Sequence, residues 1–126
     1  MSARRRSILV VDDTPDSIMV LCALLKEAFD TKVAVSGEAA LRVLRAAPVD
    51  LVLLDVMMPG LDGYEVCRRI RAAPATAALP VVFLTARDTA EDAARALAAG
   101  GSGHLAKPVD PDRLHAMLAR CFGVPP

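Results

Sequence analysis

The chain has 126 residues, of which 54% are hydrophobic, and its 15 basic and 15 acidic side chains leave a formal net charge of zero. This length predicts one domain over residues 1–126, with its core at about 6–122. The balanced charge gives no basis for direct nucleic-acid binding. No run approaches the roughly 20 apolar residues of a membrane helix, and no secretory signal is visible, so we expect a cytoplasmic protein without membrane contact.

One pattern recurs along the whole chain: a short β-branched apolar run, then turn residues, then an amphipathic segment. We expect strands near 7–11, 31–35, 51–54, 80–84 and 103–106, and helices near 15–29, 37–46, 62–72, 88–99 and 111–122. Pro15 and Pro111 suit the first helical turn, with Thr14 and Asp110 as candidate N-caps. The third and fourth runs are continuously apolar, which predicts an α/β fold whose parallel strands are covered by helices on both faces.

The three cysteines are odd in number and widely spaced. Cys22, Cys67 and Cys121 each fall in an apolar helical stretch. This distribution predicts reduced core cysteines and no disulfide framework.

Residues that can carry chemistry follow four of the five predicted strands. Asp12 and Asp13 follow the first strand, Asp55 the third, Thr85 the fourth and Lys107 the fifth. In an open parallel sheet, ligands bind in the crevice at the carboxyl ends of the strands. We therefore expect three carboxylates, a hydroxyl and an ammonium group to converge there.

Asp55 is the candidate nucleophile of this site. A carboxylate can attack a phosphoryl group and form an aspartyl phosphate, and phosphoryl transfer asks a protein mainly for positioning and charge stabilisation. Asp12, Asp13 and Asp55 would raise one another's pKa if left alone. A divalent cation removes this conflict, and a few protein oxygen ligands with retained waters suit Mg²⁺.

These residues in this order resemble the receiver domain of bacterial two-component response regulators, over roughly residues 6–122. The resemblance depends on Asp12-Asp13, the Leu-Asp-Val-Met-Met-Pro-Gly-Leu-Asp-Gly stretch at 54–63, Thr85-Ala86 and Lys107-Pro108. It implies a flavodoxin-like, doubly wound sheet of five parallel strands in the order 2-1-3-4-5 with five helices, the order of a chemotaxis member of the family.

The resemblance also implies the role of each site residue. Asp55 is the phosphoacceptor, and Asp13 and Asp55 are direct Mg²⁺ ligands. Asp12 acts on the ion mainly through water, and the backbone carbonyl of Met57 completes the ligand set. Lys107 pairs with one phosphoryl oxygen as a compact point charge. The remaining two implied features are a bond from the Thr85 hydroxyl to another phosphoryl oxygen and a cis Lys107-Pro108 peptide.

Each of these residues also has a purely structural interpretation. Asp12-Asp13 could form a strand-end turn with a helix cap, Thr85 could cap the fourth helix, and Lys107 could be a surface lysine. We expect Asp62-Gly63 to form a turn and helix start, and Met57-Met58 to pack in the core or loop. A cap role and a phosphate-binding role are compatible for Thr85.

The function that these features predict is a phosphorelay switch and not a turnover enzyme. A histidine kinase or phosphotransfer protein would supply the phosphoryl group, and residues of about 88–122 would bind an output domain or protein or form a homodimer. Two alternatives are a phosphorylation-independent interaction domain and a small Mg²⁺-dependent phosphohydrolase with an aspartyl intermediate. Adjacent Asp12-Asp13, where a haloacid dehalogenase pattern needs Asp-x-Asp, argues against the phosphohydrolase.

Two features depart from the family pattern. His104 stands where the family usually has Tyr or Phe, so an aromatic switch cannot be assumed; the alternative is a partly exposed edge-strand histidine. Gly100-Gly101-Ser102-Gly103 replaces the usual Gly-Ala-Asp-Asp turn, and its glycines predict a softer loop and last strand. Only a short tail follows residue 122, so we expect either a stand-alone receiver or the receiver part of a larger regulator or hybrid kinase.

Overall fold

The computed structural model describes residues 5–86 and 89–123, and within them five parallel strands form one sheet in the order β2-β1-β3-β4-β5. The strands are β1 (Ser7–Val11), β2 (Asp30–Ala34), β3 (Leu51–Asp55), β4 (Val81–Thr85) and β5 (Gly103–Ala106). The helices are α1 (Pro15–Leu25), α2 (Gly37–Ala46), α3 (Gly63–Ala72), the 3-10 turn η1 (Pro74–Thr76), α4 (Ala90–Ala98) and α5 (Pro111–Phe122). The predicted fold class and strand order are confirmed.

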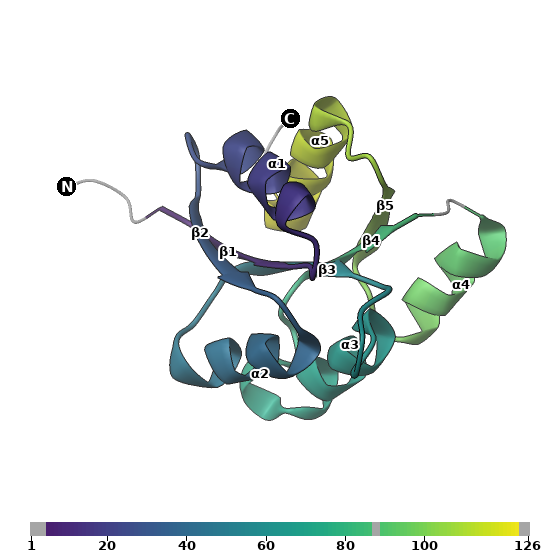
Figure 1. Ribbon diagram of the computed structural model, residues 1–126. Helices are drawn as coiled ribbons and strands as arrows, with labels where there is room; N and C mark the ends of the chain where they lie inside the picture. Colours follow the sequence, from purple (N-terminus) through teal and green to yellow (C-terminus); the bar gives the residue numbers. More distant parts are fainter. Residues whose placement is uncertain (1–4, 87–88, 124–126) are drawn as a thin grey trace.

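Helices cover both faces of the sheet, with α1 and α5 on one side and α2, α3 and α4 on the other (Figure 1). Alternate residues of β1 show why: Ile8 and Val10 pack with the α1 and α5 side, while Leu9 and Val11 pack with the α2 and α3 side. Every residue of β3 and β4 is buried, as their continuous apolar sequences predicted. The edge strands of the sheet are β2 and β5.

The first helix is shorter than predicted, because it ends at Leu25 and not near residue 29. A turn follows, in which the Phe29 N–H donates to the Leu25 carbonyl (2.9 Å). The Arg5 guanidinium donates to the carbonyls of Lys26 (2.6 Å) and Phe29 (2.9 Å), so distant side-chain donors satisfy the end of the helix. The next strand, β2, begins at Asp30, which pairs with Ser7 of β1.

Helix starts follow the predicted caps in part. Asp110 caps α5, since its carboxylate accepts from the Asp112 N–H (3.0 Å). Thr14 occupies the N-cap position of α1, but its side chain makes no capping hydrogen bond. The fourth helix begins at Ala90 with Thr89 as its cap, and residue 88, the predicted start, lies outside the described residues.

The cysteines are all free, and all three lie in helices, as predicted. Cys67 is fully buried in α3, whereas Cys22 and Cys121 are half-buried, so only Cys67 is a core residue in the strict sense. Burial raises the pKa of the Cys67 and Cys121 thiols, which favours the unreactive neutral form.

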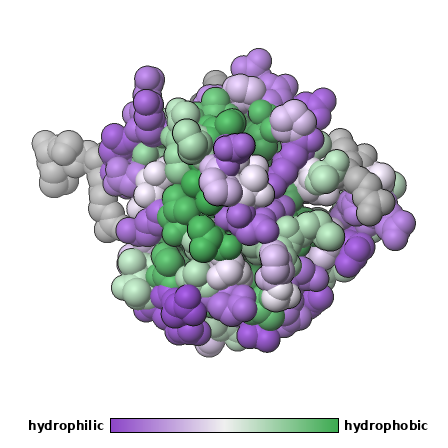
Figure 2. Space-filling view, in the orientation of Figure 1, coloured by the Kyte–Doolittle hydropathy of each residue, from purple (hydrophilic) through white to green (hydrophobic). Residues whose placement is uncertain are grey.

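On the face shown in Figure 2, hydrophilic side chains cover most of the rim, and hydrophobic residues lie nearer the middle. Large side chains that remain exposed include Met19 (69%), Met57 (75%) and Leu97 (75%). Among the described residues, no helix has the length and apolar character that crossing a bilayer requires.

Candidate functional site

The predicted site residues meet at the carboxyl edge of the sheet. Asp12 directly follows β1, Asp55 ends β3 beside it, and Lys107 directly follows β5. Carboxylate oxygens of Asp12, Asp13 and Asp55 all lie within 4.8 Å of one another. The Lys107 ammonium is 2.8 Å from Asp12 Oδ2 and 3.3 Å from Asp55 Oδ1. Four residues that the sequence placed at three strand ends thus form one charged cluster.

Asp12 is the buried anchor of this cluster. Its Oδ1 accepts from the Thr14 N–H (2.9 Å), and its Oδ2 accepts from the Lys107 ammonium (2.8 Å). The structural interpretation of Asp12 as a turn residue is therefore correct for one oxygen, while the other oxygen belongs to the site. Asp13, by contrast, is exposed, so its carboxylate is available to an ion from solvent.

Asp55 is only 5% exposed, and its surroundings disfavour the ionised form of its carboxylate. Desolvation by burial raises its pKa to about 6. The charge of Lys107 opposes this rise, the charge of Asp12 adds to it, and bonds from Lys107 and the Met57 backbone lower it. A bound cation would favour the ionised carboxylate that nucleophilic attack requires.

Lys107 is held as a cation. Burial alone would lower its pKa, but the hydrogen bond to Asp12 and the charges of Asp55 and Asp12 raise it above the ordinary lysine value. The interpretation of Lys107 as a free surface lysine is therefore wrong. Its peptide bond to Pro108 is cis, as the resemblance implied.

Thr85 ends β4 and is 7% exposed. Its carbonyl accepts from the Lys107 N–H (2.7 Å), which ties the ends of β4 and β5 together. The interpretation of Thr85 as the cap of α4 is wrong, because the Thr89 hydroxyl oxygen accepts from the Asp92 N–H (3.1 Å). Thr85 thus lies at the same edge of the sheet as the acidic cluster and is not the N-cap of α4.

The family model of the response regulator receiver domain matches residues 8–119. The chain belongs to this family. Response regulator PleD of Caulobacter vibrioides is 43% identical over 119 residues, which are 94% of this chain and 26% of that protein. DNA-binding response regulator MtrA of Mycolicibacterium smegmatis is 41% identical over 94% of this chain and 51% of that protein. The chain therefore spans about a quarter to a half of these curated relatives.

Solved structures agree with this assignment. Chemotaxis protein CheY4 of Vibrio cholerae is 28% identical and superimposes with a TM-score of 0.89, covering 94% of this chain and 99% of that one. The signal receiver domain of a histidine kinase from Syntrophus aciditrophicus is 31% identical, with a TM-score of 0.86 and coverage of 94% and 90%. The chain is a receiver domain of two-component signalling, a family of phosphorylation-dependent switches.

Gly63 is a positioning residue of the receiver site whose role the sequence did not indicate. A Cβ at this position would lie 2.4 Å from the Asp55 carbonyl oxygen, so α3 can begin this close to β3 only with glycine. Asp62 caps the helix by accepting from the Glu65 N–H (2.9 Å), as predicted for the Asp62-Gly63 pair. The Gly63 N–H donates to the Val56 carbonyl (2.9 Å) and closes the loop around Asp55.

The two methionines between β3 and α3 lie in different environments. Met58 is buried in the core, as predicted, but the Met57 side chain is 75% exposed, so the packing prediction is wrong for Met57. The implied use of the Met57 carbonyl as a metal ligand does not depend on its side chain and stays a prediction.

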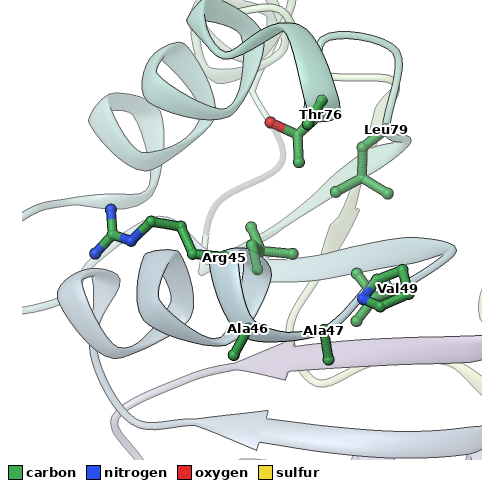
Figure 3. A pocket seen from close by; sticks show the side chains of 9 residues that line it. Arg45, Ala46, Ala47, Val49, Thr76 and Leu79 are labelled. Carbon is green, nitrogen blue, oxygen red and sulfur yellow. The ribbon is translucent and has the colours of Figure 1, made fainter.

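The opposite end of the sheet carries a groove between the end of α2 and η1, shown in Figure 3. Apolar side chains such as Val49 and Leu79 line it, together with Arg45 and Thr76. The Thr76 hydroxyl donates to the Ile70 carbonyl (2.7 Å) and so is engaged in local structure. None of the described residues that line this groove is acidic, whereas three carboxylates meet at the other end of the sheet, so the acidic cluster is the candidate functional site.

Proposed function

We propose that Asp55 accepts a phosphoryl group from a histidine kinase or phosphotransfer protein in a Mg²⁺-dependent reaction. The observation that carries the proposal is the convergence of three carboxylates and one ammonium group at a single strand edge. Isolated turn residues would not produce this arrangement, because burying carboxylates together is unfavourable without a function that uses their charge.

An ionised Asp55 carboxylate oxygen would attack the phosphorus atom of the donor. The new bond is an acyl phosphate, and the bond from phosphorus to the donor nitrogen or oxygen breaks, with the electron pair leaving on the donor. Asp12, Asp13, Asp55 and the Met57 carbonyl offer the oxygen donors that Mg²⁺ prefers. When bound, the ion supplies positive charge to the phosphoryl oxygens.

Lys107 and Thr85 would connect this reaction to a change of shape. A phosphoryl group on Asp55 offers Lys107 a stronger partner than its present bonds to Asp12 and Asp55. Shifting a two-state equilibrium from 1:99 to 99:1 needs about 5.5 kcal/mol, and two charge-assisted hydrogen bonds of about 1.5–3 kcal/mol each approach that value. A partial shift of the α4, β5 and α5 face follows.

The output of the switch would be binding through this face, at about residues 88–122, to an output domain or protein or to a second copy. We propose that residues 1–126 act as one acceptor domain and do not turn over phosphate esters. Slow loss of the group from Asp55 itself is compatible with this role.

Intact-mass measurement after incubation with Mg²⁺ and acetyl phosphate tests the proposal. We expect one added phosphoryl group that requires Mg²⁺ and is absent in Asp55→Asn. If no adduct accumulates, beryllofluoride, a non-hydrolysable phosphoryl mimic, separates rapid hydrolysis from an inert site. An inert site under both reagents would favour the phosphorylation-independent interaction domain, and turnover of added phosphate esters would favour the phosphohydrolase.

A further inference from the structure

The groove between α2 and η1 continues into a larger hollow between α2 and α3. The first part measures about 230 Å³ and the second about 540 Å³, and the two share Leu44, Arg45, Ala75 and Thr76. We call both parts together the α2–α3 groove. It lies at the amino end of the sheet, away from the acidic cluster. Its size falls in the range of about 300–1,000 Å³ that is typical of small-molecule sites.

The floor of the α2–α3 groove is apolar. Ile70 of α3 is buried, and Leu41, Leu44, Val49 and Leu79 are half-buried against the core. These side chains line one part of the groove or the other. An apolar ligand in the groove would remove their remaining exposed surface from water, which favours binding.

The walls of the groove are fixed by hydrogen bonds. The Arg71 guanidinium donates to the carbonyls of Leu79 (2.5 Å) and Gly100 (2.9 Å), which holds the segment after η1. The loop after α2 is held by Asp50, whose carboxylate accepts from the Ser7 N–H (2.7 Å) and whose N–H donates to the Ser7 carbonyl (2.8 Å). The groove is therefore largely preformed, and a ligand need not order its walls.

Positive charge is in excess on the two helices that flank the groove. Together α2 and α3 carry five arginines and two glutamates, in a chain whose formal net charge is zero. Glu65 pairs with both Arg68 (3.6 Å) and Arg69 (3.2 Å). Among the described residues, no carboxylate lies within ion-pair distance of Arg45. The partial negative charge at the C-terminal end of each helix, about half a charge, reduces this excess without cancelling it.

Arg45 is the cation best placed to hold an anion in the groove. It lines both parts, and Arg69 lines the larger one. Figure 3 shows the Arg45 side chain on the side of α2 that faces Thr76 and Leu79. None of the described residues that line either part is acidic. The groove thus combines an apolar floor with a cationic rim.

We propose that the α2–α3 groove binds a small amphiphilic anion, a single alkyl chain that ends in a carboxylate. The chain would cover Leu44 and Ile70, and the carboxylate would pair with Arg45, with Arg69 as a second donor. The ligand is taken up free from solution, because the apolar floor is recessed between two helices and a bilayer lipid would have to leave its membrane to reach it. This site is independent of phosphoryl transfer to Asp55.

Backbone amide NMR of the full chain, titrated with decanoate below its micelle concentration, tests the proposal. We expect shifts confined to α2, α3, η1 and residue 79, and weaker binding of decanol and decylammonium, which share the chain but lack the negative charge. Arg45→Gln should weaken decanoate binding about three- to tenfold and leave decanol binding unchanged. Arg42→Gln, at an exposed arginine of α2 that does not line the groove, is the matched control.

A second variant, Ala75→Phe, tests the shape of the groove apart from its charge. Ala75 is exposed in η1 and lines both parts, so a ring at this position should fill the groove and abolish binding of both decanoate and decanol. Four results would overturn the proposal: equal affinities for decanol and decanoate, full decanoate binding by Arg45→Gln, full binding by Ala75→Phe, or binding to anionic lipid vesicles without binding of free decanoate. A dimer of the chain alone that Ala75→Phe abolishes would instead assign the groove to a second copy and would also overturn it.

Discussion

At the scale of single residues, the site contains a carboxylate, Asp55, whose ionised form opposes folding. Asp55 is buried beside Asp12, and Lys107 compensates them only in part, since the pKa of Asp55 remains raised to about 6. The molecule keeps this carboxylate although an uncharged side chain of similar shape would avoid the desolvation cost. A functional site explains the retention of such a residue.

The first prediction is that Asp55→Asn stabilises the protein in the absence of divalent cations. The folded-state pKa of about 6 lies above the unfolded value of 3.8, so the unfolded state loses its proton first. The free energy of unfolding should therefore fall as pH rises from about 4 to 6, by up to about 3 kcal/mol. Urea unfolding at both ends of this range should show the fall in the natural chain and a smaller one in Asp55→Asn. Identical pH dependences would contradict the account.

The second prediction concerns Gly63, whose replacement by alanine places a Cβ against the Asp55 carbonyl. We expect Gly63→Ala to cost about 3 kcal/mol of stability by overpacking, and to slow phosphorylation because the Asp55 loop must move. Gly123→Ala is the control: its Cβ meets no atom within 4 Å, but its φ of 69° is left-handed, which costs about 1–2 kcal/mol. Equal costs for the two variants would show that the close approach at Gly63 is not limiting.

At the scale of elements, α4 is the least firmly held helix. Only Ala96 within it is buried in the core, with Ala99 just beyond its end. The Arg95 guanidinium lies 4.6 Å from the centroid of the Tyr64 ring on α3, and that ring is 5.1 Å from the Phe83 ring on β4. The cation–π contact between Arg95 and Tyr64 thus links α4 to α3.

The third prediction is that Arg95→Ala loosens α4. Loss of a partly exposed cation–π contact worth about 0.5–1 kcal/mol should speed amide hydrogen exchange in α4 by about two- to fivefold. Exchange in α2 should stay unchanged, and Arg45→Ala on α2 serves as the matched arginine control. Unchanged exchange in α4 would mean that its backbone contacts alone hold it.

The sequence predicted the elements better than their ends. Strands β1, β3 and β4 follow directly from apolar runs, since central strands bury both faces. The sequence did not predict the end of α1, where Arg5, distant in sequence, donates to the carbonyls of Lys26 and Phe29. The predicted softness of the Gly100–Gly103 turn remains to be measured, although Arg71 Nε donates to the Gly100 carbonyl (2.9 Å).

For the candidate site, too, the sequence predicted some features and not others. Strand-end positions predicted the convergence of the acidic residues and Lys107 because parallel topology brings those ends together. The pattern could not distinguish Thr85 from Thr89 as the cap of α4, since both precede the helix and both can accept from its N–H groups. Nor could it indicate that a side chain at Gly63 would collide with the Asp55 carbonyl, because this contact depends on the packing of α3 against β3.

At the scale of the whole molecule, Lys107 contacts residues that are far from it in the sequence. It connects β5, at the edge of the sheet, to Asp12 after β1 and Asp55 after β3. The candidate site is thus directly connected to β5, the short edge strand that precedes Lys107.

The fourth prediction is that Lys107→Gln separates the chemistry from the switch. The carboxylates remain, so Asp55 should still bind beryllofluoride with Mg²⁺, while the amide shifts that this reagent induces in β5 and α5 should shrink at least about twofold. Arg68→Gln, at an exposed arginine of α3 that pairs with Glu65, is the control. Full-sized shifts in Lys107→Gln would show that another residue carries the change.

The central claim, that Asp55 is the phosphoacceptor, is tested most directly by locating the modified residue. Borohydride reduces an aspartyl phosphate to homoserine, which peptide mass mapping identifies by position. After treatment with acetyl phosphate and Mg²⁺, the account predicts homoserine at position 55 alone. Homoserine at position 12 or 13, or an adduct elsewhere with position 55 unmodified, would contradict it.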